Sequence, residues 1–250
     1  MALLDFQTAL GRLVRAPDAM DPLRNLNLDA RERSHIETLS ASAGFKFAVK
    51  IQRSWCIGRA ARSAYLTLSN LHAEERQRLL NEWVESGAGT RSFYETEAEA
   101  FFEFLLQHLI DPSHERTACE LERATLRARE GEHCFFAPDL RKLDDSTIRL
   151  RRGRFAALVH FYCEPHVLSE CLQRHESLPP SSSAVASYLF APGLEHSCRP
   201  AAAHEVCVWN RLSVSSSIDA FVNEGPTRRT LEALLGCGAI EVETDHSRFS

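Results

Sequence analysis

The apolar residues of this chain follow one periodicity in its first half and another in its second half, and this change constrains the fold most. Up to about residue 136, apolar side chains recur at the three-to-four-residue spacing of amphipathic helices, beginning with residues 3–14. Asp29 with Glu32, and Ser113, are typical helix N-cap signals. Because each such helix has one apolar face to bury, we expect an α-helical bundle.

Short apolar runs replace the helical pattern in the second half. We expect strands at residues 155–162, 185–190 and 206–212, which proline, serine and glycine separate. Residues 227–235 have the pattern of a short helix, and residues 239–243 alternate apolar and charged side chains like an edge strand. These elements predict an α+β fold in which an N-terminal α-helical bundle precedes a small C-terminal β-sheet with a winged-helix-like ending.

A densely charged segment without clear periodicity separates the two halves. Pro138 and Gly153 stand near its ends. We therefore expect a helical domain over residues 1–137, a basic linker over residues 138–154 and a small α+β module over residues 155–250.

The sequence contains no common catalytic motif. It has no His-Glu-x-x-His, Gly-x-Ser-x-Gly or P-loop pattern, and none of its eight cysteines forms Cys-x-x-Cys. The best metal-binding candidate is the cluster of His160, Cys163 and His166. On a strand, His160 and Cys163 would point to opposite faces, and Pro165 argues against a helix that would bring them together. A stand-alone metalloenzyme that uses this cluster is one alternative, and we expect no cofactor in this chain.

Charge is distributed unevenly along the helical half. Residues 43–68 hold five basic and no acidic side chains, whereas residues 74–132 hold 14 acidic and 7 basic ones. Trp55 and Arg59 lie one helical turn apart in the basic segment, and tryptophan and arginine are frequent anchors of protein interfaces. A core tryptophan covered by an arginine stem would give the same pattern, so both interpretations stay open.

A compact basic run precedes the first predicted strand of the second half. It contains Arg151, Arg152 and Arg154. These side chains could bind an acidic peptide or a phosphate backbone, or the run could be a solvated linker between the domains. The chain has 34 acidic and 29 basic residues and a net charge of −5, which disfavours binding to nucleic acid. The winged-helix-like ending nevertheless makes a DNA-binding protein the second alternative.

The predicted edge strand suggests a different use for the small module. An open sheet edge presents unpaired backbone N–H and C=O groups, with which an extended peptide can pair while pockets select alternate side chains. The module therefore fits peptide binding by strand addition.

The sequence favours a cytoplasmic protein. No stretch approaches the ~18 continuous apolar residues that a membrane span requires. The first residues carry charges within a helical pattern, unlike a secretory signal, so we expect the cysteines to be thiols in a reducing compartment.

Three segments resemble the MbnC/TglI-like family of partner proteins. They are Arg53-Ser-Trp-Cys-Ile-Gly-Arg-Ala60, the stretch from Trp83 to Phe93, and the stretch from Ser113 to Ala128. The similarity covers about residues 45–130 and weakens over the C-terminal half, where the winged-helix-like ending is similar.

The resemblance implies a non-catalytic subunit of a heterodimer that acts in the biosynthesis of ribosomally made peptides. Its partner would be a DUF692-type TIM-barrel enzyme, which holds multinuclear non-haem iron and oxidatively modifies a cysteine of a precursor peptide. This chain would hold no iron and would help bind the leader part of that peptide by strand addition. We favour the 3-thiaglutamate branch over the methanobactin branch. The expected partner or peptide interface residues are Trp55, Arg59, Ser92, His114, Glu122 and Arg127, to which the basic run adds Arg151, Arg152 and Arg154.

Overall fold

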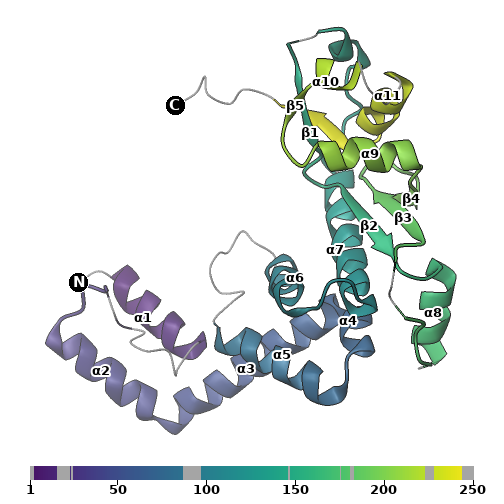
Figure 1. Ribbon diagram of the computed structural model, residues 1–250. Coiled ribbons are helices and arrows are strands. Elements are labelled where there is room, and N and C mark those ends of the chain that lie inside the picture. The colour runs from purple at the N-terminus through teal and green to yellow at the C-terminus, as the bar shows by residue number, and fades with distance from the viewer. Residues whose placement is uncertain are drawn as a thin grey trace. The chain divides into compact units, whose positions relative to one another are not determined.

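The computed structural model describes residues 3–15, 23, 25–86, 97–145, 147–174, 176–180, 183–222 and 228–243. The chain forms two compact units, Met1–Leu109 and Ile110–Ser250. In its described parts the first unit is helical, and the second combines helices with two small antiparallel sheets (Figure 1). The predicted α+β fold, with helices preceding the sheets, is confirmed.

The helices of the first unit begin where the sequence supplies caps. Asp29 and Glu32 form the predicted capping box, in which each side chain accepts a backbone N–H of the other residue. Ser42 ends one helix and caps the next. The helices are α1 (Leu3–Arg15), α2 (Ala30–Ala41), α3 (Ala43–Ser63), α4 (Tyr65–Asn70), α5 (Ala73–Glu85) and α6 (Glu97–His108).

Two apolar clusters stabilise the first unit. Ile36 of α2 is buried with Ala9 and Leu13 of α1. Trp83 of α5 is also buried, and its ring centroid lies 5.1 Å from that of Phe101 on α6. Aromatic pairs at this separation add to the stability that burial gives, so Trp83 helps to hold α5 and α6 together.

The second unit begins with a long helix that Ser113 caps, as predicted. Its elements are α7 (His114–Glu132), the 3₁₀ helix η1 (Leu140–Asp144), β1 (Arg149–Arg152), β2 (Ala157–Phe161), α8 (Pro165–Arg174), β3 (Ala186–Phe190), β4 (Cys198–Pro200), α9 (Ala203–Arg211), β5 (Ser216–Ser217), α10 (Asp219–Val222), α11 (Arg228–Gly236) and β6 (Ile240–Val242).

The strands of this unit form two sheets. One has the order β5-β1-β6 and the other β2-β3-β4. In the first sheet Leu150 lies opposite Val242, and Leu150 is fully buried in a core that includes Leu234 and Phe221 of the neighbouring helices. In the second sheet Leu158 lies opposite Leu189.

The boundary between the units differs from the sequence-based one at 137/138. Helix α7 belongs to the second unit because it runs along β2, as Figure 1 shows, and its small residues Ala124 and Ala128 pack with Val159 and Phe161. Small side chains on one helix face allow this close approach to the sheet.

The segment expected to be a basic linker is instead part of the fold. Residues 149–152 form the central strand of the β5-β1-β6 sheet. Leu150 faces the core while Arg149 and Arg151 are exposed, so the strand alternates as a half-buried strand should. This strand was not predicted from the sequence because its three arginines give it the composition of a linker.

The strand predicted at 206–212 is wrong, because Ala203–Arg211 form helix α9. The carboxylate of Glu205 accepts the backbone N–H of Ala202, which satisfies a donor at the helix start. The apolar residues Val208 and Trp209 are buried on one side of this helix. The winged-helix likeness of the ending stays a prediction.

Candidate functional site

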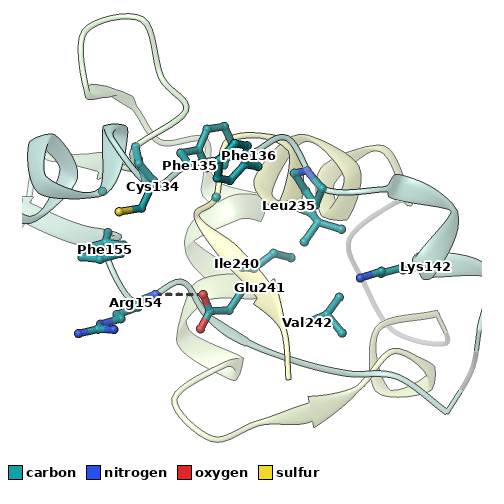
Figure 2. A pocket seen from close by; sticks show the side chains of 14 residues that line it. Cys134, Phe135, Phe136, Lys142, Arg154, Phe155, Leu235, Ile240, Glu241 and Val242 are labelled. Carbon is teal, nitrogen blue, oxygen red and sulfur yellow. Dashed lines mark hydrogen bonds between the residues drawn. The ribbon is translucent and has the colours of Figure 1, made fainter. Parts of the chain in front are cut away.

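A cavity of about 340 Å³ opens in the second unit between β6 and the segment that follows α7 (Figure 2). This volume lies within the range of small-ligand pockets and accommodates a few side chains. The walls are mainly apolar, with charged groups at Lys142, Arg154 and Glu241. The lining residues are Gly131, Cys134, Phe135, Phe136, Pro138, Lys142, Arg154, Phe155, Pro192, Leu235, Gly238, Ile240, Glu241 and Val242.

Glycines allow the aromatic walls of this pocket to pack against the backbone. A Cβ atom at Gly193 would lie 2.5 Å from the Phe135 ring, and one at Gly238 would lie 2.8 Å from it. A Cβ atom at Gly131 would lie 2.7 Å from the side chain of Phe155. Any larger residue at these positions would displace a pocket wall, so the glycines help to define the pocket.

Strand β6 gives the pocket an open backbone edge. Among the described residues, β6 pairs with β1 and with no other strand. Gly153 N–H donates to Ala239 C=O, and Glu243 N–H donates to Arg149 C=O. In an antiparallel ladder every second residue bonds to the neighbouring strand, so Ile240 and Val242 direct their N–H and C=O groups away from β1. Ile240 is 1% exposed and Val242 is half-buried, so the accessible part of this edge lies at Val242. Both residues also line the pocket.

The rim of the pocket carries a cluster of charges and an exposed ring. Glu241 is paired with Arg151, with 2.7 Å between Oε1 and the guanidinium, and its other oxygen accepts the N–H of Arg154 (Figure 2). The guanidinium of Arg154 lies 5.2 Å from the centre of the Phe155 ring, within the range of a cation–π contact. Phe136 is 85% exposed, so a large apolar surface stands at the mouth.

The two predicted interface residues of α3 are exposed. Trp55 is 63% exposed, which excludes its alternative reading as a core tryptophan. Arg59 is paired with Glu97 of α6, with 2.6 Å between Nε and Oε2. Ser92, the third residue predicted in this half, lies outside the described residues.

The predicted residues of α7 lie within the second unit and are less accessible. His114 is buried, and its Nε2 donates to the carbonyl of Pro179 at 2.6 Å. Glu122 and Arg127 are half-buried, and both take part in contacts. His114 therefore has a structural contact in this unit, and none of the three lines the pocket.

The three predicted arginines of the basic run lie in different environments. Arg151 pairs with Glu241, and Arg154 lines the pocket. Arg152 lies over the Trp209 ring at 5.0 Å and donates to the Trp209 carbonyl, and burial lowers the pKa of its guanidinium. Of the predicted residues, Arg151 and Arg154 are therefore the two that the fold brings to the pocket rim.

The histidine and cysteine cluster considered for a metal does not converge in the structure. His160 Nδ1 lies 2.8 Å from the Ser187 hydroxyl, whereas His166 is exposed on α8. Cys163 is buried, and that burial raises the pKa of its thiol. Pro165 is the first residue of α8, a position where its missing N–H costs nothing. Within the ranges that the structure describes, no three His, Cys, Asp or Glu side chains gather as metal ligands.

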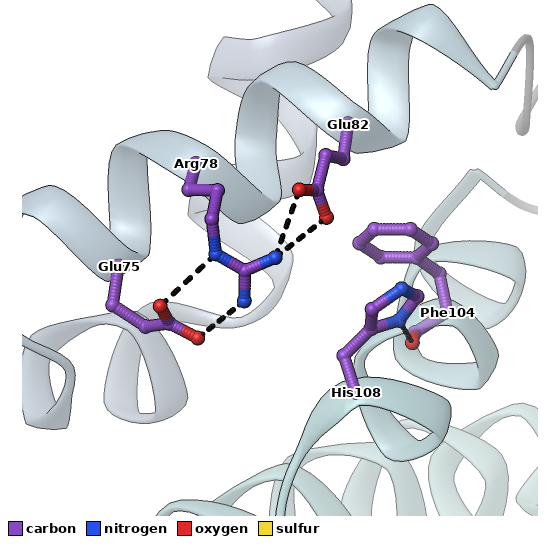
Figure 3. Close-up of polar contacts among 5 residues, drawn as sticks. All are labelled: Glu75, Arg78, Glu82, Phe104 and His108. Carbon is purple, nitrogen blue, oxygen red and sulfur yellow. Dashed lines mark hydrogen bonds and ion pairs between the residues drawn. The ribbon is translucent and has the colours of Figure 1, made fainter.

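The acidic surface of α5 is occupied by internal ion pairs (Figure 3). Arg78 contacts Glu75 at 2.6 Å and Glu82 at 2.8 Å, and the hydrogen bond from Arg78 lowers the pKa of Glu75. Nearby, His108 packs on Phe104 and bonds to its carbonyl. Pairs at these helical spacings are typical of a solvated helix face.

Most of the residues that form the pocket were not predicted from the sequence. Phe135, Phe136 and Phe155 were not predicted as site residues, and neither was Lys142. The signals for them were the aromatic pair directly after a helix and the edge-strand alternation at 239–243, which correctly indicated β6. Nothing local in the sequence indicates that these two segments meet.

No helix in the described ranges combines the length and apolar character that crossing a membrane requires. Comparisons of the chain with protein-family models, curated proteins and solved structures gave no match.

Proposed function

We propose that this chain is a non-catalytic subunit that binds a ribosomally made precursor peptide by strand addition. It presents the peptide's cysteine to a separate DUF692-type TIM-barrel enzyme that carries the iron. The resemblance covers both the 3-thiaglutamate and the methanobactin type of modification, and we slightly favour the 3-thiaglutamate type. The proposal therefore joins two supports, the resemblance over residues 45–130 and the geometry of the pocket beside β6.

The observation that carries the proposal is the open edge of β6 beside an apolar pocket. The backbone groups of Ile240 and Val242 point away from β1 in the spacing that an extended peptide requires, and those of Val242 are at the half-buried, accessible end of the edge. Ile240 is buried, so a peptide that pairs with it has to displace the side chains that cover it. Side chains of such a peptide alternate in direction, so every second one can enter the pocket lined by Phe135 and Phe155. Backbone pairing supplies affinity and the pocket supplies selectivity.

The charges at the rim fit a peptide with acidic residues. Arg154 and Lys142 line the pocket, and Arg154 is exposed. Glu241 is already paired with Arg151, so it opposes an incoming carboxylate less than a free glutamate would. We expect a leader segment that places an apolar side chain in the pocket and an acidic one near Arg154.

A backbone-directed substitution tests strand addition. Val242→Pro removes the N–H that faces the open edge while leaving the β1 ladder, which uses Glu241 and Glu243, intact. Val242→Ala is the matched control, because it shortens the same side chain and keeps the N–H. The proposal places the gene of a short cysteine-bearing precursor peptide next to the gene of this chain. That peptide, carrying a fluorescent label, is titrated with each variant, and binding is measured by anisotropy.

We expect Val242→Pro to weaken peptide binding at least tenfold and Val242→Ala to weaken it much less. Equal affinities for the two variants would contradict strand addition at β6. Two further measurements address the alternatives. Stoichiometric iron or zinc with turnover in the purified chain would indicate a metalloenzyme, and a steeply salt-dependent affinity for duplex DNA would indicate a DNA-binding protein.

A further inference from the structure

Helix α3 carries a continuous exposed stripe with an apolar centre. Phe47, Ile51 and Trp55 follow at intervals of four residues, and they are 65%, 43% and 63% exposed. Residues at this spacing share one helix face. Gly58 continues the same face one turn later, with open space around its Cβ position. From Phe47 to Gly58 the stripe is about 17 Å long at a rise of about 1.5 Å per residue.

The stripe is bordered by positive charge. Lys50 is exposed on one side of it and Arg59 on the other, and Arg62 is exposed at its C-terminal end. Arg59 is paired with Glu97, but among the described residues neither Lys50 nor Arg62 has an acidic partner. The segment 43–68 contains no acidic residue at all. A partner that covers the stripe therefore gains by bringing carboxylates to its borders.

The same charges disfavour a second copy of this chain as the occupant. In a symmetric dimer the stripe would contact itself, because a two-fold axis places the same surface on both sides. Lys50 and Arg62 would then face basic residues of the other copy, with no carboxylate of α3 between them. Like charges at an interface cost several kcal/mol, so a distinct, acidic partner fits better.

We propose that the stripe of Phe47, Ile51 and Trp55 on α3 is the docking surface for an amphipathic helix of a different protein, whose apolar face is bordered by carboxylates. The inference rests on the proposed function, since the iron enzyme of that complex is the protein expected to supply the helix. Peptide binding at β6 and enzyme docking at α3 would then use separate surfaces of the chain.

Binding between the purified full chain and the co-expressed iron enzyme is the test, measured by interferometry at two salt concentrations. The variants are Trp55→Ala and Lys50→Glu. The matched control is Tyr65→Ala, which removes an equally exposed aromatic ring from α4, outside the stripe. Affinity for the labelled precursor peptide is measured in parallel for each variant.

We expect Trp55→Ala and Lys50→Glu each to weaken enzyme binding at least tenfold, with Tyr65→Ala and the peptide affinity unchanged. Wild-type binding should also weaken as salt rises. If the complex forms and both stripe variants bind like the wild type, the docking inference is overturned and the proposed function stands. No complex with the wild-type chain would overturn both. A wild-type dimer that Trp55→Glu converts to monomer would assign the stripe to a second copy and overturn the inference.

Discussion

The ring of Phe135 lies against the backbone of Gly238, so closely that a Cβ atom at position 238 would come within 2.8 Å of it. Gly238 also has φ of +74°, in the left-handed region that side chains rarely adopt. This one glycine thus makes the turn into β6 and leaves room for the aromatic wall of the pocket. Its replacement should affect stability and the pocket together.

We expect Gly238→Ala to lower the free energy of unfolding by about 1–3 kcal/mol, because it combines backbone strain with a steric clash. Gly236 is the matched control, since a Cβ there meets nothing within 4 Å. Gly236→Ala should be neutral or slightly stabilising. Urea denaturation followed by circular dichroism measures both, and similar values for the two variants would show that Phe135 and the turn adapt freely.

The helical first half could be predicted from the sequence because its signals are local. The capping box at Asp29 and Glu32 and the cap at Ser113 mark helix starts without reference to the rest of the chain. The assignment of α7 to the second unit could not be predicted, because it depends on the contact of Ala124 and Ala128 with a sheet formed later in the sequence. Periodicity identifies a helix but does not identify what the helix packs against.

The second half was harder to predict because composition and structure disagree there. Arg149–Arg152 form a central strand despite three arginines, since Leu150 provides the one buried side chain that the strand requires. The run at 206–212 is apolar like a strand, but Glu205 at the start and Val208 and Trp209 on one face make it a helix. The pocket is formed by segments that are distant in the sequence and meet only in the folded unit. Its edge strand, β6, was the one part of it that the sequence predicted.

The two tryptophans of the first unit should differ sharply in their effect on stability. Trp83 is 1% exposed and packs on Phe101, so Trp83→Ala should cost about 3–5 kcal/mol. Trp55 is exposed on α3, and Trp55→Ala should change stability by less than about 0.5 kcal/mol. Thermal and urea denaturation of both variants measures this. A large loss for Trp55→Ala would mean that it stabilises the fold and would weaken its assignment to docking.

The buried carboxylate of Glu205 should make stability depend on pH in the acidic range. Arg199 donates to both of its oxygens, one at 2.7 Å, and this hydrogen bonding lowers the pKa of Glu205 below its usual value. A carboxyl whose pKa is lower in the folded state stabilises the fold above its unfolded pKa of about 4.3. That contribution is lost as the pH falls through the lower, folded pKa.

Glu205→Gln should therefore be clearly less stable than the wild type at pH 7, and the difference should shrink as the pH falls below about 4. Unfolding free energies from urea titrations between pH 7 and pH 3 measure the difference. Glu195→Gln is the control, because Glu195 is exposed in the same unit and its loss should leave stability at pH 7 unchanged. A difference for Glu205→Gln that stays constant with pH would mean that the ionisation of Glu205 does not cause the difference.

The cysteines should divide into reactive and unreactive groups according to burial. Cys134, at the pocket, and Cys207, on α9, are exposed. Cys163 and Cys237 are buried, and burial raises the pKa of both thiols, which reduces the thiolate that reacts with alkylating reagents. With limiting iodoacetamide at neutral pH, mass spectrometry of peptides should find Cys134 and Cys207 modified well before Cys163 and Cys237.

Peptide bound at β6 should slow the alkylation of Cys134 and leave that of Cys207 unchanged, because Cys134 lines the pocket and Cys207 does not. Cys207 thus serves as an internal control for reagent activity within the same sample. Protection of Cys134 by the precursor peptide would place the peptide at the pocket independently of the Val242 variants. Equal modification of Cys134 with and without saturating peptide would instead mean that the peptide binds elsewhere on the chain.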